Sequence, residues 1–484
     1  MDKTGKTPLL KALVKHQKLM TAPFHMPGHK KGKGVGKGFA QLMKKDPFSL
    51  DMTEVPGLDD LHNPCGPIQE AQEIAARLFG AEQTFFLVNG TSVGIHAAIM
   101  AVCRQNDTIL LPRDIHRSVI GACILSGARP EYLPARIAED FFVPLPPRAG
   151  DVKAALGKDR IAKAVMQVYP SYYGIAGNLK EIADIAHSHQ IPLIVDEAHG
   201  AHFAFSSRMP APAIEQGADI SVQSTHKTLG ALTQASMLHF NSRIIEGAEV
   251  FRNLKILQST SPSYLLMASL DSVIGQMGED GEALLEKTIN LAEYVRREIR
   301  FIPGLKCLDE TVLGSEEGLT VDPTKIYISF RGIGLTGHRA AQILLKKYKI
   351  QVELSDRYNV LFMLSVGNTA NDAERLIRAL KEMASVKRRP IKLNQQFNFG
   401  FTPLVALTTR EAWFAPKKRI PLQESVGQVA AELIAPYPPG IPLICPGEEI
   451  TRELVEVILA MKSENYSFHG PEDHSVETMN VVIG

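Results

Sequence analysis

Between residues 61 and 300, short apolar runs alternate with longer stretches of helical periodicity, and this alternation leaves few folds open to the chain. Repeated strand and helix units favour an α/β architecture, a mainly parallel sheet with helices on both faces. In such sheets, ligand sites form beyond the carboxyl ends of the strands. The predicted strands are Thr84–Val88, Thr108–Leu111, Pro130–Leu133, Ala164–Tyr169, Pro192–Asp196 and Ile220–Gln223, and one predicted helix between them is Leu179–His189.

Two of these strands lead into residues of opposite charge. Asp196 closes one strand, with His199 just after it, and the run Ser224-Thr225-His226-Lys227 follows the next. A lysine delivered beside a carboxylate suggests a site for pyridoxal phosphate (PLP). Lys227 would hold the cofactor as a Schiff base, and Asp196 would pair with its pyridinium nitrogen. A lone His-Lys pair is more commonly a solvated surface feature, and three further features favour the cofactor site.

The first feature is the glycine turn Val88–Gly94, which contains Gly90, Thr91 and Ser92 and lies between a predicted strand and a predicted helix. Unpaired N–H groups and hydroxyls at a helix N-terminus favour a phosphate. An ordinary capped helix is the alternative interpretation of the same residues.

The second feature is His116, which follows the strand Thr108–Leu111 and can lay a flat ring against the cofactor, although a structural loop histidine is the alternative. The third is the aromatic turn Tyr169–Gly174, which suits a cofactor rim but also any crossover loop. All of these residues fall at the carboxyl ends of predicted strands, and that convergence carries more weight than any one motif.

The composition is that of an ordinary globular protein. At 484 residues, with 45% hydrophobic and 22% charged residues, the chain can form two or three domains. A net charge of +1 gives no basis for binding nucleic acid or a membrane. Five scattered cysteines predict reduced thiols in the cytoplasm, with no disulfide framework and no metal site. No signal peptide or spanning apolar run is present, and the basic run Lys30–Gly38 is predicted to be a mobile solvated loop.

Composition and periodicity divide the chain into four predicted parts. These are an N-terminal arm (1–60), a large PLP-binding domain (61–300), a small α/β domain (301–390) and a C-terminal domain (391–484). The arm has a short helix near Pro8–Leu19 and little core of its own, so we expect it to wrap onto the rest or onto a second subunit. Long helices are predicted from Tyr264 to Arg300, and prolines make Pro436–Leu443 an extended, stiff loop.

Three motifs connect the chain to a known family. They are Phe24–Lys30 (F-H-M-P-G-H-K), the block from Asp196 to Lys227, and Pro436–Glu448 (P-Y-P-P-G-I-P-L-I-C-P-G-E). Through them nearly the whole chain resembles the group I ornithine/lysine/arginine decarboxylases, a branch of the fold type I (aspartate aminotransferase-like) PLP enzymes, and most closely their short Gram-positive biosynthetic form. The first and third motifs are the more specific, because many PLP enzymes share the second. One departure is Tyr169, where relatives often have Asn.

The resemblance implies a role for each matching residue. Lys227 would form the Schiff base, Asp196 would pair with the pyridinium nitrogen, and His116 would stack on the ring. The other residues expected around the cofactor are Gly90, Thr91, Ser92, Ala198, His199, Ser224 and His226. Thr260 is expected to reach the phosphate of a second subunit.

The implied reaction is the PLP-dependent decarboxylation of a basic amino acid. Arginine, converted to agmatine for polyamine biosynthesis, is the predicted substrate, with lysine or ornithine as alternatives. A cationic side chain needs acidic partners. The candidates for substrate binding are His25, Glu448, Glu472 and Asp473, with Asp59 and Asp60 in the arm, and each carboxylate can equally be a solvated surface group. The acid that protonates Cα is either His226 or a side chain of the partner subunit.

The resemblance also implies a homodimer, or a pair of dimers, with shared active sites. Longer members carry an N-terminal wing domain that builds decamers, and only 24 residues precede His25 here. One competing interpretation is another fold type I enzyme, such as an aminotransferase or acyltransferase, which would lack the arm motif and the proline-rich segment. The other is a catalytically silent homologue, which intact Asp196, His199 and Lys227 disfavour.

Overall fold

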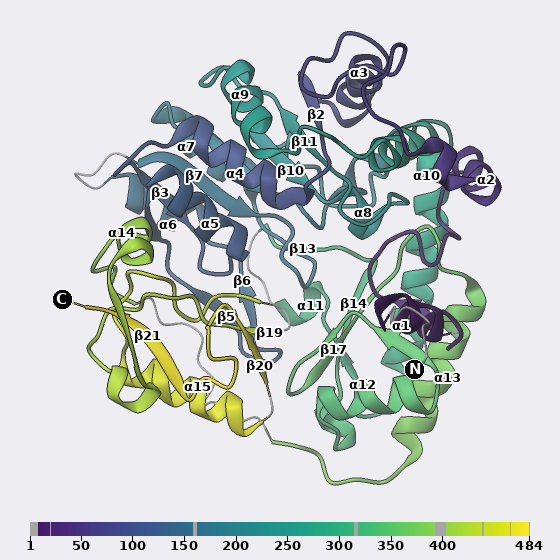
Figure 1. The fold of residues 1–484 in the computed structure, drawn as a ribbon. Coiled ribbons are helices and arrows are strands. Elements are labelled where there is room, and N and C mark those ends of the chain that lie inside the picture. The colour runs from purple at the N-terminus through teal and green to yellow at the C-terminus, as the bar shows by residue number, and fades with distance from the viewer. Residues whose placement is uncertain are drawn as a thin grey trace, which may run out of the picture.

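The computed structural model describes residues 8–19, 21–157, 162–313, 318–392, 403–437, 440–464 and 466–483. Figure 1 shows three units, with the major domain uppermost, the C-terminal unit in yellow at one side below it, and the small domain in green at the other. Among the described residues, no helix combines the length and the apolar character needed to cross a lipid bilayer. The cysteines are free thiols, as expected.

The major domain contains a seven-stranded sheet in the order β2-β11-β10-β9-β7-β3-β4 within the described residues. The strands are β2 (Gln83–Leu87), β3 (Thr108–Leu111), β4 (Arg129–Tyr132), β7 (Ala162–Val168), β9 (Leu193–Asp196), β10 (Ile220–Gln223) and β11 (Ser236–Phe240). Six of these strands run in one direction, and β11 runs against them. All six predicted strands are confirmed to within two residues at each end, and β11 was not predicted.

Helices cover both faces of this sheet, as the alternating pattern predicted. One apolar core unites the sheet with α3 (Pro67–Phe79), α6 (Ala149–Leu156) and α7 (Leu179–Ser188). A second core, on the other face, contains α4 (Gly90–Val102), α5 (Arg117–Ser126) and α9 (Gly247–Leu257). Successive residues of each strand enter opposite cores, as Ile194 and Val195 do, because side chains alternate along a strand.

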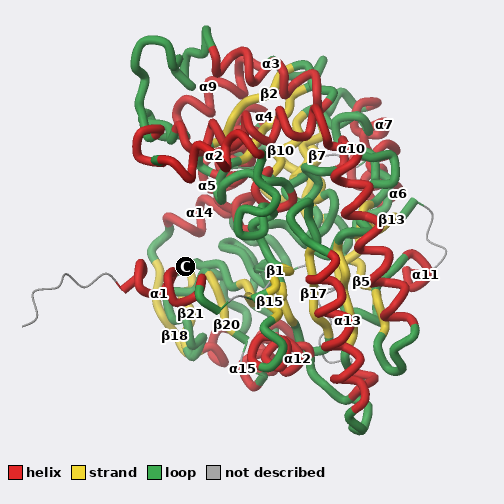
Figure 2. Tube along the Cα trace, turned by 90° about the vertical axis from the view of Figure 1, so that its right-hand side faces the viewer, coloured by secondary structure: helices red, strands yellow, loops and turns green. Residues whose placement is uncertain are grey.

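A single helix, α10 (Tyr264–Arg300), joins the major domain to the small domain. Its first half packs into the first major-domain core, and Ala292, Val295 and Ile299 enter the core of the small domain. Figure 2 shows α10 along one side of the molecule, beside α13 (Ala370–Ser385). The predicted long helices are therefore one continuous rod, which fixes the two domains relative to each other.

The small domain is built on the antiparallel sheet β12-β14-β17-β16, covered by α12 (Gly337–Lys346) and α13. Its strands are β12 (Lys306–Cys307), β14 (Lys325–Ser329), β16 (Leu354–Ser355) and β17 (Asn359–Met363). The N-terminal arm adds β1 (Ala22–Phe24), which pairs in parallel with β15 (Ile350–Val352), while α1 (Pro8–Gln17) lies exposed on the surface. The arm thus wraps onto its own chain.

The C-terminal unit has a core of its own around α15 (Arg452–Ser463) and the ribbon β18 (Lys417–Pro421) with β21 (Thr478–Val482). Another short helix, α14 (Thr409–Phe414), contacts α5 of the major domain. In the proline-rich segment, β19 (Ala435–Tyr437) pairs with β20 (Ser467–His469), whereas residues 438–439 lie outside the described part of the chain. Of that segment, Pro436 and Tyr437 are extended as predicted, but the N–H of Gly440, at φ +95°, donates to the carbonyl of Pro436 at 2.9 Å, so the predicted extended loop does not continue to Leu443.

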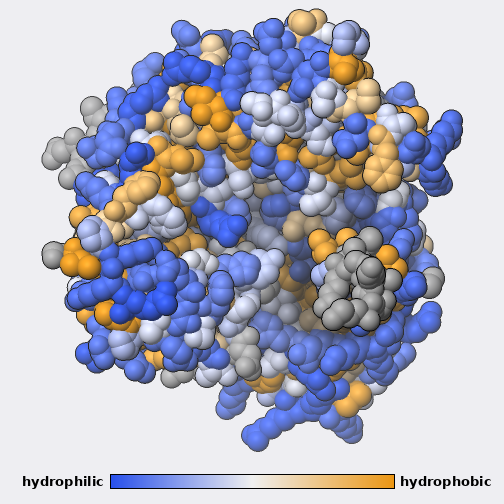
Figure 3. All heavy atoms as spheres, viewed as in Figure 1, coloured by the Kyte–Doolittle hydropathy of each residue, from blue (hydrophilic) through white to orange (hydrophobic). Residues whose placement is uncertain are grey.

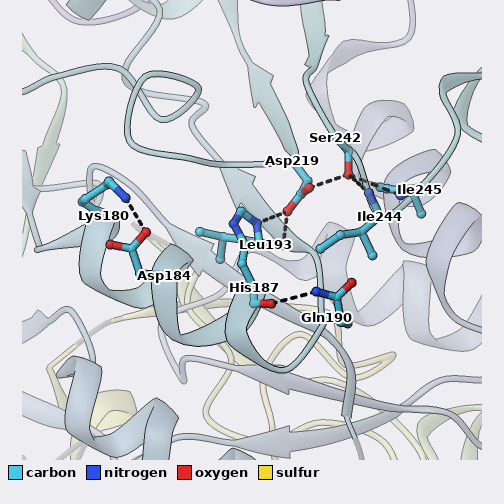
Figure 4. Close-up of polar contacts among 9 residues, drawn as sticks. All are labelled: Lys180, Asp184, His187, Gln190, Leu193, Asp219, Ser242, Ile244 and Ile245. Atoms are coloured by element: carbon cyan, nitrogen blue, oxygen red, sulfur yellow. Dashed lines mark hydrogen bonds and ion pairs between the residues drawn. The ribbon is translucent and has the colours of Figure 1, made fainter.

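A buried carboxylate fastens the amino edge of the large sheet, opposite the edge predicted to carry the site (Figure 4). Asp219, just before β10, accepts hydrogen bonds from the backbone N–H of Leu193 and from Nε2 of His187, both at 2.8 Å. Its other oxygen accepts from the hydroxyl of Ser242. One side chain thus joins β9, α7 and the loop after β11, and is only 2% exposed.

Replacing Asp219 by alanine should destabilise the major domain and leave the opposite sheet edge unchanged. We expect a loss of about 2–4 kcal/mol in the free energy of unfolding, because three donors lose their charged acceptor inside the protein. Urea unfolding followed by circular dichroism measures this. The matched control is Asp184→Ala, which removes the exposed Lys180–Asp184 pair of Figure 4 and should cost less than about 0.5 kcal/mol. Equal losses in both variants would contradict the assigned role of Asp219.

Candidate active site

The carboxyl ends of the parallel strands bring the predicted site residues to one edge of the large sheet. Asp196 ends β9, and the short helix α8 (Thr225–Thr228), which contains Lys227, follows β10. These strands pair in parallel with Asp196 opposite Val222, so the turn after β10 lies directly beyond the aspartate. The glycine turn after β2 and His116 after β3 lie at the same edge, because both strands run in the same direction as β9.

The charges of the half-buried Lys227 and the buried Asp196 act on each other. Burial lowers the pKa of Lys227, and the charges of Asp196 and Glu353 oppose that shift. Burial raises the pKa of Asp196, and the Lys227 charge and the N–H of Ala198, 3.1 Å from Oδ1, counteract it. The pair therefore combines an amine that deprotonates more readily than a solvated lysine with a carboxylate held in a fixed orientation.

His199 lies against Lys227 on the side of the small domain. Its Nε2 is 3.2 Å from Nζ of Lys227, and its ring lies under that of Tyr172, with centroids 4.6 Å apart. Burial lowers the pKa of His199 well below its ordinary value, so the ring is neutral and can accept a hydrogen bond from the lysine. Its buried Nδ1 has no hydrogen-bond partner among the described residues.

The N-terminus of α4 forms a polar cradle with the hydroxyl of Ser224, just after β10, and that of Ser236 on β11. Gly90 opens the helix at φ +76°, a conformation that favours glycine, and Asn89 provides no side-chain cap. Thr91 hydrogen bonds through its hydroxyl to that of Ser224 and lies 3.2 Å from that of Ser236. Ser92 follows in the same half-buried first turn. Orphan helix N–H groups beside clustered hydroxyls favour an anion; Ser236 lies on the unpredicted strand β11.

The two remaining predicted histidines are held by the backbone. His116 caps α5, where its Nδ1 accepts from the N–H of Ser118, and its ring is left open to solvent. Nδ1 of His226 lies 3.0 Å from the Ala235 carbonyl. Desolvation lowers the pKa of His226 to about 4, so its ring is neutral at pH 7.

The arm motif lies against the turn that carries Lys227. The N–H of Gly28 donates to the carbonyl of His226 at 2.8 Å, and a Cβ on Gly28 would meet the Leu229 carbonyl at 2.4 Å, so only glycine fits here. Lys30 is 1% exposed and donates through Nζ to the carbonyls of His25 and Met363. The prediction that this basic run starts as a solvated loop is wrong at Lys30, because backbone carbonyls satisfy its ammonium group in the interior.

The predicted substrate-binding carboxylates are not gathered at this site. Glu448 is buried and accepts two hydrogen bonds from Arg113, at 2.5 and 2.9 Å. Glu472 is exposed and pairs with Lys417 and Arg419, and Asp473 accepts from Ser475 and Thr478 in its own loop. In the arm, Asp59 accepts backbone N–H groups of residues 65, 66 and 68, and Asp60 accepts that of residue 62. These contacts account for each carboxylate without a ligand.

Two other predicted residues have different surroundings. Thr260 is exposed in the loop between α9 and α10, so its contact with a second subunit remains a prediction. His25 lies with the arm near Lys30 and Glu353; its buried Nε2 has no partner among the described residues, and burial lowers its pKa.

Sequence analysis missed a half-buried carboxylate that connects three parts of the chain. Glu353, between β15 and β16, accepts the N–H of Met26 at 2.8 Å and the hydroxyl of Tyr172 at 2.5 Å. Lys325 of β14 donates to the Tyr172 carbonyl, and burial lowers its pKa to about 7. Because Met26 and Glu353 are 327 residues apart, no local pattern could have paired them. The motifs around Met26 and Tyr172 were the only available signal.

Comparisons with known proteins agree with this geometry. The chain is 39% identical over 478 residues to an arginine decarboxylase of Bacillus subtilis, covering 98% of each sequence. A solved constitutive lysine decarboxylase of Escherichia coli superposes with a TM-score of 0.77 at 22% identity, over 99% of this chain and 82% of that one. A ureidoglycine-glyoxylate aminotransferase of Bacillus subtilis superposes with a TM-score of 0.58 at 15% identity, over 75% and 92% of the two chains.

The two structural likenesses establish the fold, which is that of the fold type I PLP enzymes, as the sequence predicted. Family models match residues 7–372, described as the major domain of Orn/Lys/Arg decarboxylases, and residues 396–477, described as their C-terminal domain. Together these two matches cover most of the chain. The protein belongs to the Orn/Lys/Arg decarboxylase family.

Proposed function

We propose that this protein is a PLP-dependent arginine decarboxylase, which releases CO2 and agmatine. The observation that carries the proposal is the full-length likeness to arginine decarboxylases at 38–40% identity, together with a half-buried Lys227 whose charge interacts with that of Asp196. Lysine decarboxylases resemble the chain more distantly, at 25–26% identity, and lysine is therefore the second candidate substrate.

The residues at the sheet edge fit PLP. Lys227 supplies an amine with a lowered pKa, and Asp196 supplies a carboxylate for a ring nitrogen. The helix start at Gly90 and the hydroxyls of Thr91 and Ser224 suit a phosphate ester. The hydroxyls of Thr225 and Thr228 are buried with no partner among the described residues, so the turn holding Lys227 has unused hydrogen-bonding capacity.

When bound, PLP supplies a ring that accepts the electron pair left behind when CO2 departs. The chain's own residues prepare for this chemistry. Burial favours the neutral form of the Lys227 amine, which covalent attachment requires, and Nε2 of the neutral His199, 3.2 Å from Nζ, can accept a hydrogen bond from it. The Asp196 carboxylate would favour a proton at the ring nitrogen of bound PLP, and His116, after β3 at the same sheet edge, would lie against the cofactor.

Tyr172 and Glu353 complete the arrangement as positioning residues. The Tyr172 ring rests on His199, and Glu353 fixes the Tyr172 hydroxyl to the small domain and to the arm. This chain of contacts keeps His199 against Lys227 only when the arm and the small domain are in place. We further propose a homodimer with shared sites, for which the exposed Thr260 loop is the predicted contact.

Purified protein loaded with PLP should release CO2 from arginine faster than from lysine or ornithine, with agmatine identified by mass spectrometry. The same measurement with all three amino acids tests the substrate directly. Cadaverine or putrescine as the main product would replace arginine by lysine or ornithine and keep the chemistry. Without CO2 from any of the three, the decarboxylase proposal fails.

Lys227→Ala should lose both activity and the visible absorbance of bound PLP, because the covalent link to the protein is gone. Asp196→Ala should retain some PLP and lower kcat by about 100- to 1000-fold, since the electrostatic support of the ring nitrogen is lost. Absorbance spectra and CO2 release measure these effects. Lys255→Ala, at an exposed lysine of α9, is the control and should match the wild type. Near-normal activity of Asp196→Ala would contradict its assigned role.

Tyr172→Phe and Glu353→Gln should each lower kcat/KM roughly three- to tenfold, because each loses one hydrogen bond that positions His199. The kcat/KM of the double variant should be no lower than that of the less active single variant, since both changes break the same contact. Steady-state kinetics of all four proteins test this coupling. Tyr348→Phe, which removes an exposed tyrosine–glutamate contact to Glu382, is the control. Additive effects in the double variant would show that Tyr172 and Glu353 act separately.

A further inference from the structure

The proline-rich motif of the C-terminal unit builds a cavity that the proposed reaction does not use. The cavity lies where this unit meets the loop Pro112–Asp114, the hairpin of β5 (Arg136–Ala138) with β6 (Val143–Leu145), and the small-domain loop at 356–358. Figure 3 shows the molecular surface hollowed near the centre of this face, where the three units meet. Lys227, Asp196 and the α4 cradle are not among the residues that line the cavity.

The size and the lining of the cavity suit a small apolar group. The volume is about 120 Å³, comparable to the roughly 150 Å³ of an apolar cavity that holds a benzene molecule. Ile137 and Leu145 form the wall on the side of the major domain, and Ile441, Leu443 and Met461 form the wall on the side of the C-terminal unit. Methylene groups transferred from water to such walls gain about 0.8 kcal/mol each.

Most charged groups around the cavity already have partners. Arg113 pairs with Glu448, and Arg357 pairs with Glu464 at 2.6 Å. Asp356 accepts from the hydroxyl of Tyr327 and from two backbone N–H groups. Arg136 donates to the carbonyl of Pro146. These groups are therefore poorly placed to recognise a ligand charge.

Asp114 and Tyr173 are the exceptions. Both residues line the cavity, and the Asp114 charge acts on the Tyr173 hydroxyl. The Asp114 carboxylate is stabilised by the backbone N–H of its own residue, and among the described residues no other side chain makes a hydrogen bond to it or to the Tyr173 hydroxyl. Burial raises the pKa of Asp114 to about 6, which leaves it ionised at neutral pH. An anionic acceptor beside a phenol, at the end of an apolar cavity, complements a positively charged N–H donor on an aliphatic chain.

We propose that this cavity binds a linear aliphatic amine, with its ammonium group on Asp114 and Tyr173 and its methylenes against the apolar walls. Asp114 lies two residues before His116, and its charge also acts on Asp196. A cation bound at Asp114 would therefore offset the charge that Asp114 exerts on Asp196, without occupying the cofactor site. That the natural ligand is an amine released by the reaction rests on the proposed function; the cavity and its charge do not.

The probe is n-hexylamine, titrated calorimetrically into the PLP-loaded protein, with 1-hexanol as its neutral match. We expect one hexylamine site with a dissociation constant on the order of 0.1–10 mM and at least tenfold weaker binding of hexanol. Asp114→Asn and Ile441→Trp, which remove the charge and fill the cavity, should each weaken hexylamine binding at least tenfold. Ile256→Trp, at a residue that is 72% exposed on α9, is the matched control.

Two further measurements separate this cavity from the Lys227 site. Hexylamine should still bind to Lys227→Ala, in which the amine of the proposed active site is absent. It should also reduce CO2 release noncompetitively in the wild type and much less in Ile441→Trp. Equal affinity for hexanol, unchanged binding in both cavity variants, or loss of binding in Lys227→Ala would each overturn the proposal. Failure of the arginine assay alone would leave the binding result intact and would count against the proposed reaction only.

Discussion

The structure depends on keeping a lysine amine inside the protein next to a carboxylate. An ammonium shielded from water is unfavourable unless it has partners, and the half-buried Lys227 has Nε2 of His199 at 3.2 Å and the charge of Asp196 acting on it. The two parallel strands β9 and β10 supply that proximity, since their paired ends place the aspartate next to the turn with the lysine. The sheet, its two covering layers of helices and the buried Asp219 at its far edge all serve to hold this spacing.

Local sequence patterns predicted the features that depend on neighbouring residues in the chain. The six parallel strands, the helix start at Gly90 and the lysine turn each have a continuous sequence signature, and each is found where it was expected. Strand β11 was not predicted because its polar residues are typical of a loop. Ser236 and His239 are buried, and His239 hydrogen bonds to Thr84 and Gln223 on the neighbouring strands. These contacts satisfy polar side chains that the sequence alone would place in solvent.

Side chains whose roles depend on distant partners could not be predicted. Glu448 belongs to a specific motif and was expected at the substrate, but Arg113, 335 residues away, occupies its carboxylate. Glu353 belongs to no motif, yet it joins the arm, the small domain and Tyr172. Sequence indicated which segments matter, and only the fold could indicate which carboxylate each segment meets.

The pairing of β1 with β15 has a consequence for synthesis of the chain. The arm leaves the ribosome first, but Ala22 pairs with Ile350, and Phe24 is buried in a core made mainly from residues after 290. The large sheet, the lysine turn and the α4 cradle are complete by residue 240, so they can assemble while the arm still has no partner. Vectorial folding therefore allows the cofactor cradle to assemble early, whereas the segment Phe24–Lys30 stays without its native contacts until the small domain has been made.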